Sequence, residues 1–523
     1  MNNPPIPTIA TPPRTVAGVL RRLGPGLIIA ASIVGSGELI MTTKTGAQAG
    51  FSLLWLIIIG CVIKVFVQVE LGRYAISTGR TTMEALDEVP GPRLRVNWLV
   101  WYWLVMFVFS LMQLGGIVGG VGQSLAMSRP LTGDFNRLLD AQDEWDRQAA
   151  PLREQLRSEC AAALRSPDPT EREATARRLQ ERIVQQLGRP RPDGDTLDDV
   201  YWAAVATAVT IVLLVVGRYS VVQNVSAVLV AAFTFVTIVA VAGLQFDPRY
   251  TITAGDLRLG LSFRLPPPIE GIARSPLATA LAAFGIIGVG ATELIFYPYW
   301  CLEKGYARFA GPADPSDEWA DRARGWLRVM RWDALGSMAI YTFATVAFYL
   351  LGAAVLWRSG LDPAGNQMVR TLGAMYVPVF GAAAWWLFLF GAFAVLYSTF
   401  FVSTAGHARV VADAIRVYRL GAVDAASRQR WVQALCVVFP LFSLAVHYLY
   451  PRPTVLVAAS GVMQAIMLPM LAGATLYYRY RRCDPRIAPG RLWDALLWLS
   501  SAGLLVAGGW LVVTKLFPAL ETI

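Results

Sequence analysis

Gly35-Ser36-Gly37-Glu38 and Gly288-Val289-Gly290-Ala291-Thr292-Glu293 are the two stretches that decide the fold of this 523-residue chain. Each interrupts an apolar run long enough to cross a bilayer, and each ends in an acidic residue. Glycine weakens a helix and a carboxylate is costly inside hydrocarbon, so each stretch predicts an unwound segment facing a cavity. Two such breaks at corresponding places in the two halves of a chain indicate the substrate site of a transporter.

The composition is typical of a polytopic α-helical membrane protein, because 55% of the residues are hydrophobic. Runs of about 20 apolar residues cross a bilayer as helices. Eleven such runs are predicted, at 24–45, 51–75, 98–127, 200–216, 221–244, 276–300, 333–357, 376–404, 431–450, 454–478 and 493–514.

The net charge of +10 reflects membrane topology rather than binding to nucleic acid. Arginines concentrate in alternate short loops, after the second, sixth, eighth and tenth apolar runs. The positive-inside rule places those loops and the N-terminus in the cytoplasm, and eleven spans then put the C-terminus outside. We therefore expect an integral protein of the plasma membrane, which is the inner membrane of a bacterium.

Residues 129–199 are too charged to lie in a membrane. Two helices are predicted there, one that Pro151 could open and one that Gly188 would end. The segment is expected to be an exposed extracytoplasmic hairpin, and docking of a partner or gating of substrate is the alternative. The expected division of the chain is a cytoplasmic tail (1–23), membrane helices 1–3 (24–128), the insertion (129–199), membrane helices 4–11 (200–515) and an extracytoplasmic tail (516–523).

The first break carries candidate ion-binding residues. Unwinding at Gly35, Ser36 and Gly37 would free backbone carbonyls for a cation and leave Glu38 at bilayer depth, facing the cavity. Close packing of helices through small residues would explain the glycines but not Glu38.

The second break carries Gly290, Ala291, Thr292 and Glu293. Thr292 and Glu293 offer hard oxygen ligands, which suit magnesium, calcium, manganese or sodium. The alternative is that Glu293 forms an ion pair with an internal cation such as Lys64.

Other polar residues give weaker signals. Lys64 and Glu70 lie in the second run as possible coupling or ion-pair residues, although snorkelling also explains Glu70. Asp333, at the start of the seventh run, is expected to be an interfacial cap. Neither His407 nor His447 falls in a break, so a central histidine proton relay is not expected. No cofactor motif or catalytic constellation stands out, and neither an enzyme nor a cofactor is predicted.

A set of motifs along the membrane region carries a family resemblance. They are Gly24-Pro25-Gly26, Gly37, Gly46-Ala47-Gln48-Ala49-Gly50, Leu53-Leu54-Trp55-Leu56, Gly72-Arg73, Thr78-Gly79-Arg80, Gly290-Ala291-Thr292, Ser460 and Pro469. In these the chain resembles the Nramp family of divalent-metal transporters. The resemblance implies an all-α membrane protein of the LeuT-type fold, with 11 transmembrane helices, two inverted five-helix repeats and broken helices 1 and 6.

The chain departs from the family where the family binds metal. The first-helix motif Asp-Pro-Gly-Asn has Gly35 and Glu38 at its two ligand positions. The sixth-helix motif Met-Pro-His-Asn falls on Leu294-Ile295-Phe296-Tyr297, and a tenth-helix glutamine falls on Gly461. Losing the thioether removes a preference for soft metals, and added carboxylates favour hard cations. The missing histidine weakens the case for family-type proton coupling.

The sequence thus predicts a secondary transporter that moves a hard divalent cation, magnesium- or manganese-like, by alternating access. Glu38, Thr292 and Glu293 are the expected metal ligands, and a monomer is expected in the lipid bilayer. One alternative is a transporter of a non-metal organic solute on the same scaffold, with Glu38 or Glu293 as a proton or sodium coupling site. The other is a non-transporting membrane sensor whose insertion is its docking surface.

Overall fold

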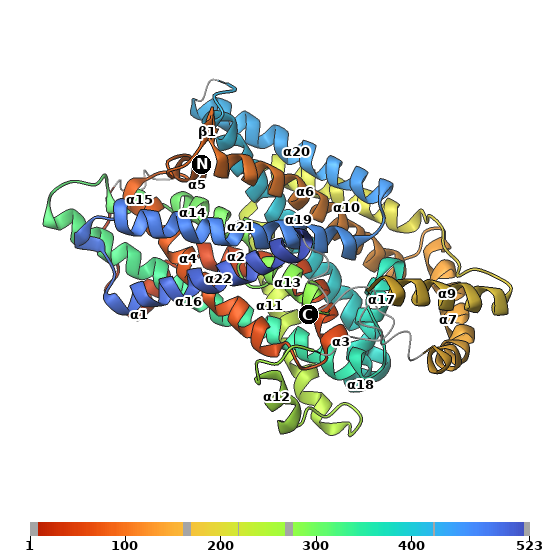
Figure 1. Ribbon diagram of the computed structural model, residues 1–523. Helices are drawn as coiled ribbons and strands as arrows, with labels where there is room; N and C mark the ends of the chain where they lie inside the picture. The colour runs from red at the N-terminus through yellow and green to blue at the C-terminus, as the bar shows by residue number, and fades with distance from the viewer. Residues whose placement is uncertain (1–8, 161–168, 218, 267–275, 422–423, 517–523) are drawn as a thin grey trace.

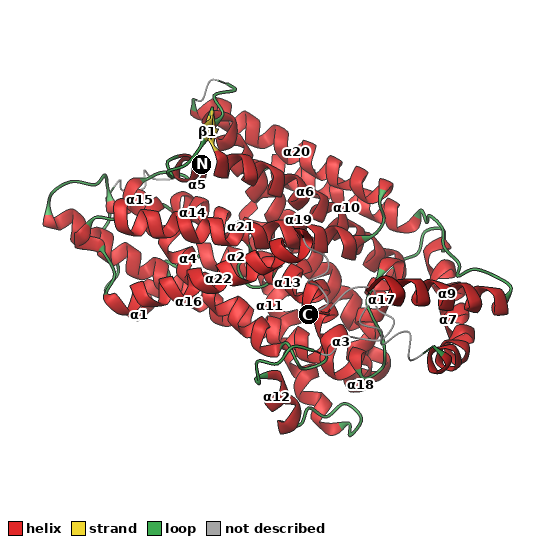
Figure 2. Cartoon of the chain, in the orientation of Figure 1, coloured by secondary structure: helices red, strands yellow, loops and turns green. Residues whose placement is uncertain are grey.

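The computed structural model describes residues 9–160, 169–217, 219–266, 276–421 and 424–516. The described chain is almost entirely helical (Figure 2). Its strands are β1 (Arg93–Leu94) and β2 (Val96–Asn97), a short antiparallel pair that precedes the third membrane helix.

Ten helices in the described chain are long and apolar enough to cross a membrane. They are α4 (Leu54–Thr78), α6 (Trp98–Ser128), α10 (Asp198–Val215), α11 (Tyr219–Gly243), α13 (Pro276–Ile286) with α14 (Ala291–Lys304), α16 (Asp317–Leu351) with η3 (Gly352–Trp357), α19 (Ala384–Val417), α20 (Ala425–Leu449), α21 (Pro453–Arg481) and α22 (Arg491–Leu516). An eleventh span precedes them in three pieces, α2 (Pro25–Ile33), η1 (Gly37–Thr42) and α3 (Thr43–Ala49). The spans are gathered side by side in one bundle (Figure 1).

The first and sixth spans are broken where the glycines predict it. Helix α2 ends at Ile33, and η1 resumes at Gly37 as a widened π-helical turn. The hydroxyl of Thr42 donates to the carbonyl of Gly37, which supports that turn. In the sixth span α13 ends at Ile286 and α14 starts at Ala291. Between them Gly288 has φ +57°, a left-handed conformation that strongly favours glycine.

Glycines also let the broken helices pack closely on their neighbours. A methyl group on Gly352 would lie 2.3 Å from the carbonyl oxygen of Thr43, so α3 lies directly against η3. A methyl group on Gly285 would lie 2.0 Å from the carbonyl oxygen of Gly461, which puts α13 against α21. These contacts fix the second half of the first span and the first half of the sixth.

Two spans are longer than their apolar runs predict. The seventh begins at Asp317 rather than at 333, and the eighth continues to Val417 rather than ending at 404. The hydropathy signal stops where charged residues begin, but these helices continue because their extensions still bury apolar residues such as Trp319, Trp326 and Val410. Asp333 and His407 are therefore buried within helices.

The insertion is a helical hairpin formed by α7 (Asp134–Glu159) and α9 (Pro169–Leu187), which projects from one end of the bundle (Figure 1). It has its own apolar core, which includes Trp145, Leu156 and Ile183. Pro151 lies inside α7, so the prediction that it opens the helix is wrong. The start lies further back, where backbone N–H groups of residues 197 and 198 donate to Asp134 at the base of the hairpin. Gly188, with φ +66°, follows α9 directly, as predicted.

The described part of the N-terminal tail is packed on the protein. Ala10 donates its N–H to the carbonyl of Phe309 in α15 (Tyr306–Ala310), and the indole of Trp326 donates to the carbonyl of Ala10. A short helix, α1 (Val16–Leu20), then leads into α2. Residues 1–8 and 517–523 of the two predicted tails lie outside the described residues.

Candidate functional site

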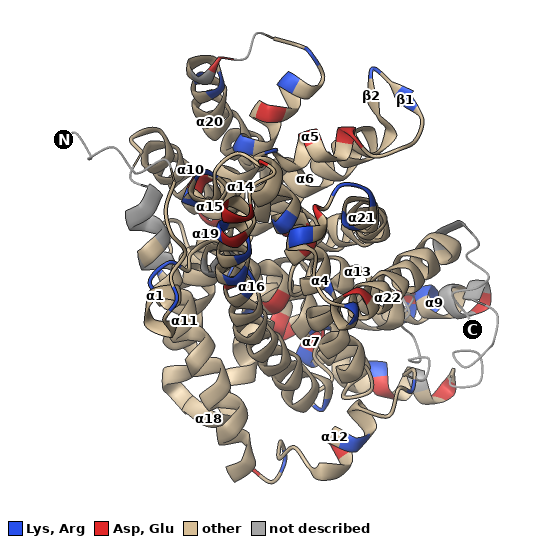
Figure 3. Ribbon diagram, turned by 90° about the vertical axis from the view of Figure 1, so that its left-hand side faces the viewer, with Lys and Arg blue, Asp and Glu red and all other residues tan. Residues whose placement is uncertain are grey.

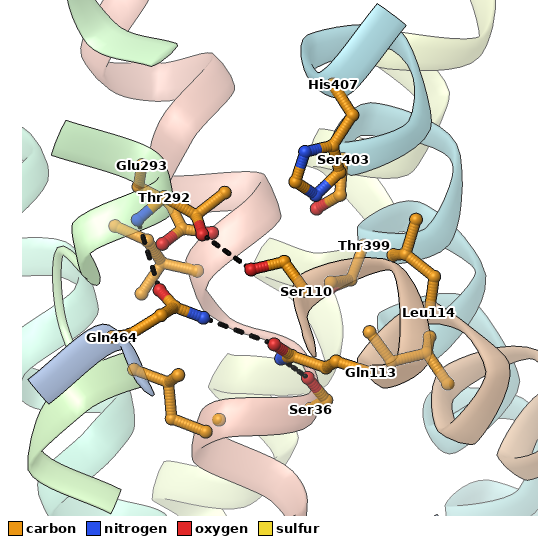
Figure 4. A pocket seen from close by; sticks show the side chains of 14 residues that line it. Ser36, Ser110, Gln113, Leu114, Thr292, Glu293, Thr399, Ser403, His407 and Gln464 are labelled. Atoms are coloured by element: carbon orange, nitrogen blue, oxygen red, sulfur yellow. Dashed lines mark hydrogen bonds between the residues drawn. The ribbon is translucent and has the colours of Figure 1, made fainter. Parts of the chain in front are cut away.

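A cavity lies between the two breaks, bordered by α6, α19 and α21 (Figure 4). Its empty volume is ≈ 390 Å³, but this figure includes the gaps between lining atoms and space open to solvent, so it does not give the size of a ligand. The volume therefore does not identify the ligand, and the chemistry of the ligand has to be inferred from the donor atoms of the lining. The polar residues in its lining are Ser36, Ser110, Gln113, Thr292, Glu293, Thr399, Ser403, His407 and Gln464.

A chain of hydrogen bonds crosses the cavity and joins the two breaks (Figure 4). The backbone N–H of Thr292 donates to Gln464 Oε1 at 3.1 Å, and Gln464 Nε2 donates to Gln113 Oε1 at 3.2 Å. Gln113 Nε2 donates in turn to Ser36 Oγ at 3.1 Å. The hydroxyls of Ser110 and Thr292 lie 3.3 Å apart. The two breaks are thus held together through side chains of α6 and α21.

Helical periodicity places these side chains on the cavity. Thr399, Ser403 and His407 follow one another at intervals of four on α19, so they share one face. Ser460 and Gln464 have the same spacing on α21, and Gln464 Nε2 also donates to Ser460 Oγ at 3.1 Å. This spacing of polar residues in apolar helices was a signal in the sequence. Gln113 and Gln464 were not predicted because they are neither charged nor part of a break, and His407 was set aside because it lies in neither break.

Glu293 contributes the carboxylate of the cavity. It lies in the first turn of α14, where the positive end of the helix dipole favours an anion. A methyl group on Gly290 would lie 2.6 Å from Glu293 Oε2, so the carboxylate lies over the second break. In the described chain no group of three or more His, Cys, Asp or Glu residues is placed to hold a metal ion. A cation here would therefore be bound by one carboxylate together with neutral oxygens and water.

Glu38 lies in the wall beside the cavity and is not part of its lining. Its Oε1 accepts the N–H of Gly288 at 3.0 Å and the hydroxyl of Thr345 at 3.3 Å. Its Oε2 accepts the N–H of Gly35 at 3.4 Å. The predicted orientation of Glu38 into the cavity is therefore not what the structure has. Its carboxylate instead joins the unwound backbone of both breaks.

Lys64 also binds the backbone at the second break. Its fully buried ammonium donates to the carbonyls of Phe284 and Ile287, at the C-terminal end of α13. A cation at the last carbonyls of a helix is favoured by the helix dipole. Among the ion pairs of the described residues, none joins Lys64 to Glu293, which is the pair the sequence offered as an alternative.

The remaining candidates have structural partners away from the cavity. Glu70 forms a buried ion pair with Arg73 at 3.1 Å and accepts the indole N–H of Trp493 at 2.7 Å. Asp333 accepts the N–H groups of Gly24 and Gly26 and the hydroxyl of Tyr297. The prediction of an interfacial cap at the start of the seventh span is therefore wrong, because Asp333 is buried inside α16 and caps the start of α2 instead.

The predicted position of the tenth-helix glutamine needs a correction. Gly461 faces α13, and a methyl group there would lie 2.3 Å from the carbonyl oxygen of Ala282. No longer side chain fits at that contact. Gln464, one turn later, is the glutamine of α21 that lines the cavity.

Comparisons with known proteins cover nearly the whole membrane region. A family model described as "Natural resistance-associated macrophage protein-like" matches residues 26–132 and 195–514. The gap between the two matched parts coincides with the hairpin of α7 and α9.

Two curated relatives match over short stretches. The "Divalent metal cation transporter MntH" of Yersinia enterocolitica is 28% identical over 93 residues, which are 17% of this chain and 23% of the relative. The "Metal transporter Nramp6.2" of Populus trichocarpa is 32% identical over 79 residues, 15% of this chain and 14% of the relative. The matched stretches thus span less than a quarter of either relative.

Solved structures match over almost the full length. A mutant of the manganese transporter of Eremococcus coleocola has a TM-score of 0.60 at 14% identity, covering 96% of this chain and 88% of that one. The same transporter with a bound aromatic bis-isothiourea compound also gives 0.60 at 14% identity, covering 98% and 91%. At this identity the likeness shows the fold, and the predicted LeuT-type arrangement with broken helices 1 and 6 is confirmed. From the match of the family model over most of its length, the chain belongs to the Nramp (natural resistance-associated macrophage protein-like) family.

Proposed function

We propose that this protein moves a hard divalent cation, magnesium- or manganese-like, across the membrane by alternating access. The observation that carries the proposal is the donor set of the cavity between the two breaks. That set consists of one carboxylate, hydroxyls, amides and an imidazole, and no lining residue contains sulfur. Magnesium and manganese favour oxygen ligands, and magnesium keeps several of its waters, so one carboxylate with neutral oxygens is a suitable site.

Family membership supports a transporter rather than an enzyme. The relatives with similar sequences or folds are named as transporters of divalent metal cations or of manganese. On the proposed function Glu293 and Thr292 are the ligands predicted from the sequence that bind the cation, together with Ser36 and the backbone around Gly35, Gly37, Gly290 and Ala291. Glu38 and Lys64 act as positioning residues that hold the second break in shape.

The same residues suggest how access alternates. Ser36 belongs to the first break and Thr292 and Glu293 to the second, so a cation between them would hold the two unwound segments together. Release of the cation would let the half-helices on either side separate toward one face of the membrane. We further propose that the N-terminus is cytoplasmic and the C-terminus outside, in a bacterial inner membrane, because the arginine-rich end of the bundle follows the positive-inside rule (Figure 3). A monomer is proposed.

One observation favours a second candidate. Because the described residues offer no cluster of acidic, histidine or cysteine ligands, a neutral polar solute held by the hydroxyls and amides is the alternative substrate.

Isothermal titration of the purified protein with magnesium, manganese and calcium distinguishes the two. We expect saturable binding to the unaltered chain and at least ten-fold weaker binding to Glu293→Gln, since one charge-assisted contact contributes roughly 1.5–3 kcal/mol. Glu303→Gln is the matched control, because Glu303 lies on the same helix but pairs with Arg409 at 2.7 Å. Absence of saturable binding in the unaltered protein would refute cation transport. Equal binding by Glu293→Gln and Glu303→Gln would show that Glu293 is not a ligand of the cation.

A further inference from the structure

A second pocket lies at the arginine-rich end of the bundle, between α4 and α21. It is lined by Glu70, Arg73, Tyr74, Ser77, Tyr478, Arg479, Arg482 and Cys483. None of these residues lines the cavity between the breaks. Figure 3, which faces this end, shows lysines and arginines gathered around α16 and α21.

Two buried hydrogen-bond donors in this pocket have no partner in the described structure. Arg73 is 4% exposed; its Nε donates to Glu70 and its Nη1 donates to the carbonyl of Ile487 at 2.9 Å, while its Nη2 has no acceptor. The hydroxyl of Tyr478, which is 2% exposed, has none either. A buried donor left without an acceptor costs roughly 1–3 kcal/mol, so the pocket favours a ligand with acceptor oxygens.

The charges of the lining favour an anion. Arg73 is paired with Glu70, and Arg479 is paired with Asp494 at 2.7 Å. Arg482 makes no ion pair among the described residues, and its Nε donates only to the hydroxyl of Tyr477 at 3.3 Å. Asp484 follows closely in the chain, but its carboxylate is bound by Arg486, whose guanidinium lowers the pKa of Asp484. One guanidinium of the lining thus remains without a countercharge.

We propose that this pocket binds a phosphate group, carried either by an anionic phospholipid or by a free phosphate ion. The three acceptor oxygens and the negative charge of a phosphate match two unpartnered donors and an unpaired arginine. Basic pockets between membrane helices on the cytoplasmic side are sites where anionic lipid headgroups bind. The proposal is independent of the transported substrate, because it involves neither break.

The test measures the apparent unfolding temperature of the full-length protein purified in detergent. One arm titrates inorganic phosphate against chloride at equal ionic strength. The other arm adds phosphatidylglycerol, against diacylglycerol with the same acyl chains and no phosphate. We expect a saturable rise in at least one arm, and the arm that shows it identifies the source of the phosphate.

Variants assign the effect to the pocket. Arg482→Gln should raise the half-saturating concentration roughly three-fold, as expected for loss of one exposed ionic contact, and Tyr478→Phe should weaken binding in the same direction. Arg481→Gln is the matched control, because Arg481 is exposed and adjacent but does not line the pocket. Its titration should equal that of the unaltered protein. In the absence of ligand, the Arg482→Gln variant should unfold at the same temperature as the unaltered protein, which would show that its fold is intact.

Two results would overturn the proposal. One is the absence of a saturable rise in unfolding temperature in both arms, which would mean that water satisfies the two donors. The other is an equal shift in Arg482→Gln and Arg481→Gln, which would reduce the effect to general attraction of anions by a basic surface.

Discussion

Glu38 and Glu293 each follow a helix break, but their carboxylates have different surroundings. Glu38 accepts backbone N–H groups from both breaks and is fully buried, whereas Glu293 lies in the lining of the cavity. A carboxylate that already accepts several hydrogen bonds holds structure, and one that borders open space is available to a ligand. The sequence could reveal two costly charges at bilayer depth, but it could not distinguish these roles, because each depends on which N–H groups the other break presents.

Glu38→Ala should therefore destabilise the protein more than Glu293→Ala. The first change leaves the N–H groups of Gly35 and Gly288 without an acceptor, at a cost of roughly 1–3 kcal/mol each. Apparent unfolding temperatures in detergent compare the two variants. A loss in Glu293→Ala as large as in Glu38→Ala would contradict the positioning role of Glu38.

Lys64→Met should loosen the second break, because it removes a buried ammonium from the carbonyls of Phe284 and Ile287. Hydrogen exchange of the peptide that contains residues 284–294 should become faster. Lys44→Met is the control, since Lys44 forms a partly exposed ion pair with Asp362, a type of contact that contributes about 0–1 kcal/mol. Unchanged exchange in Lys64→Met would mean that the glycine-rich backbone holds the break without the lysine.

At the scale of elements, the apolar runs predicted the number of spans and both breaks, since hydrophobicity and glycine act locally. The ends of α16 and α19 could not be predicted from hydropathy, because polar residues such as Asp333 and His407 are buried against other helices. The position of Gln464 was missed for a related reason. Which of Gly461 and Gln464 faces the cavity depends on the contact of α21 with α13, and nothing in the sequence of α21 alone determines it.

Gly461→Ala tests that contact. The added methyl group would lie 2.3 Å from the carbonyl of Ala282, so α13 and α21 would have to separate. Overpacking of this kind typically costs about 1–3 kcal/mol, and we expect a lower unfolding temperature and weaker cation binding. Gly473→Ala on the same helix is the matched control, because no atom lies within 4 Å of the added methyl group there. Equal stability of the two variants would show that the contact between α13 and α21 can relax.

At the scale of the whole molecule, the hairpin of α7 and α9 is a separate unit attached to a complete transporter fold. It has an apolar core of its own, while Phe135 and Leu139 at the start of α7 are buried in the core of the bundle. It leaves and rejoins the bundle at one place, where Asp198 accepts N–H groups of residues 131–133 and Asp134 accepts that of Leu197. Beyond this base, Arg370 pairs with Asp140 and Asp143.

Replacing residues 136–195 with a short Gly/Ser linker should therefore leave the bundle folded. The deletion keeps Asp134, Phe135 and Asp198. It removes two partly exposed ion pairs, each contributing about 0–1 kcal/mol, together with the hydrogen bond from Gln367 to Asp143 and the packing of Leu139 in the bundle core. We expect cation binding within two-fold of the full chain by titration calorimetry, and a lower unfolding temperature because the buried side chain of Leu139 is lost. Loss of cation binding in a folded deletion variant would instead assign the hairpin a role in gating.

The hydrogen-bonded chain from Thr292 through Gln464 and Gln113 to Ser36 has a consequence for the transport cycle. A cation at the hydroxyl oxygen of Ser36 would compete with the amide hydrogen of Gln113 for the same lone pairs. On the proposed function, the amide of Gln113 would therefore occupy the oxygen of Ser36 when no cation is bound. A site closed in this way would let the carrier return empty, which would permit net transport instead of one-for-one exchange.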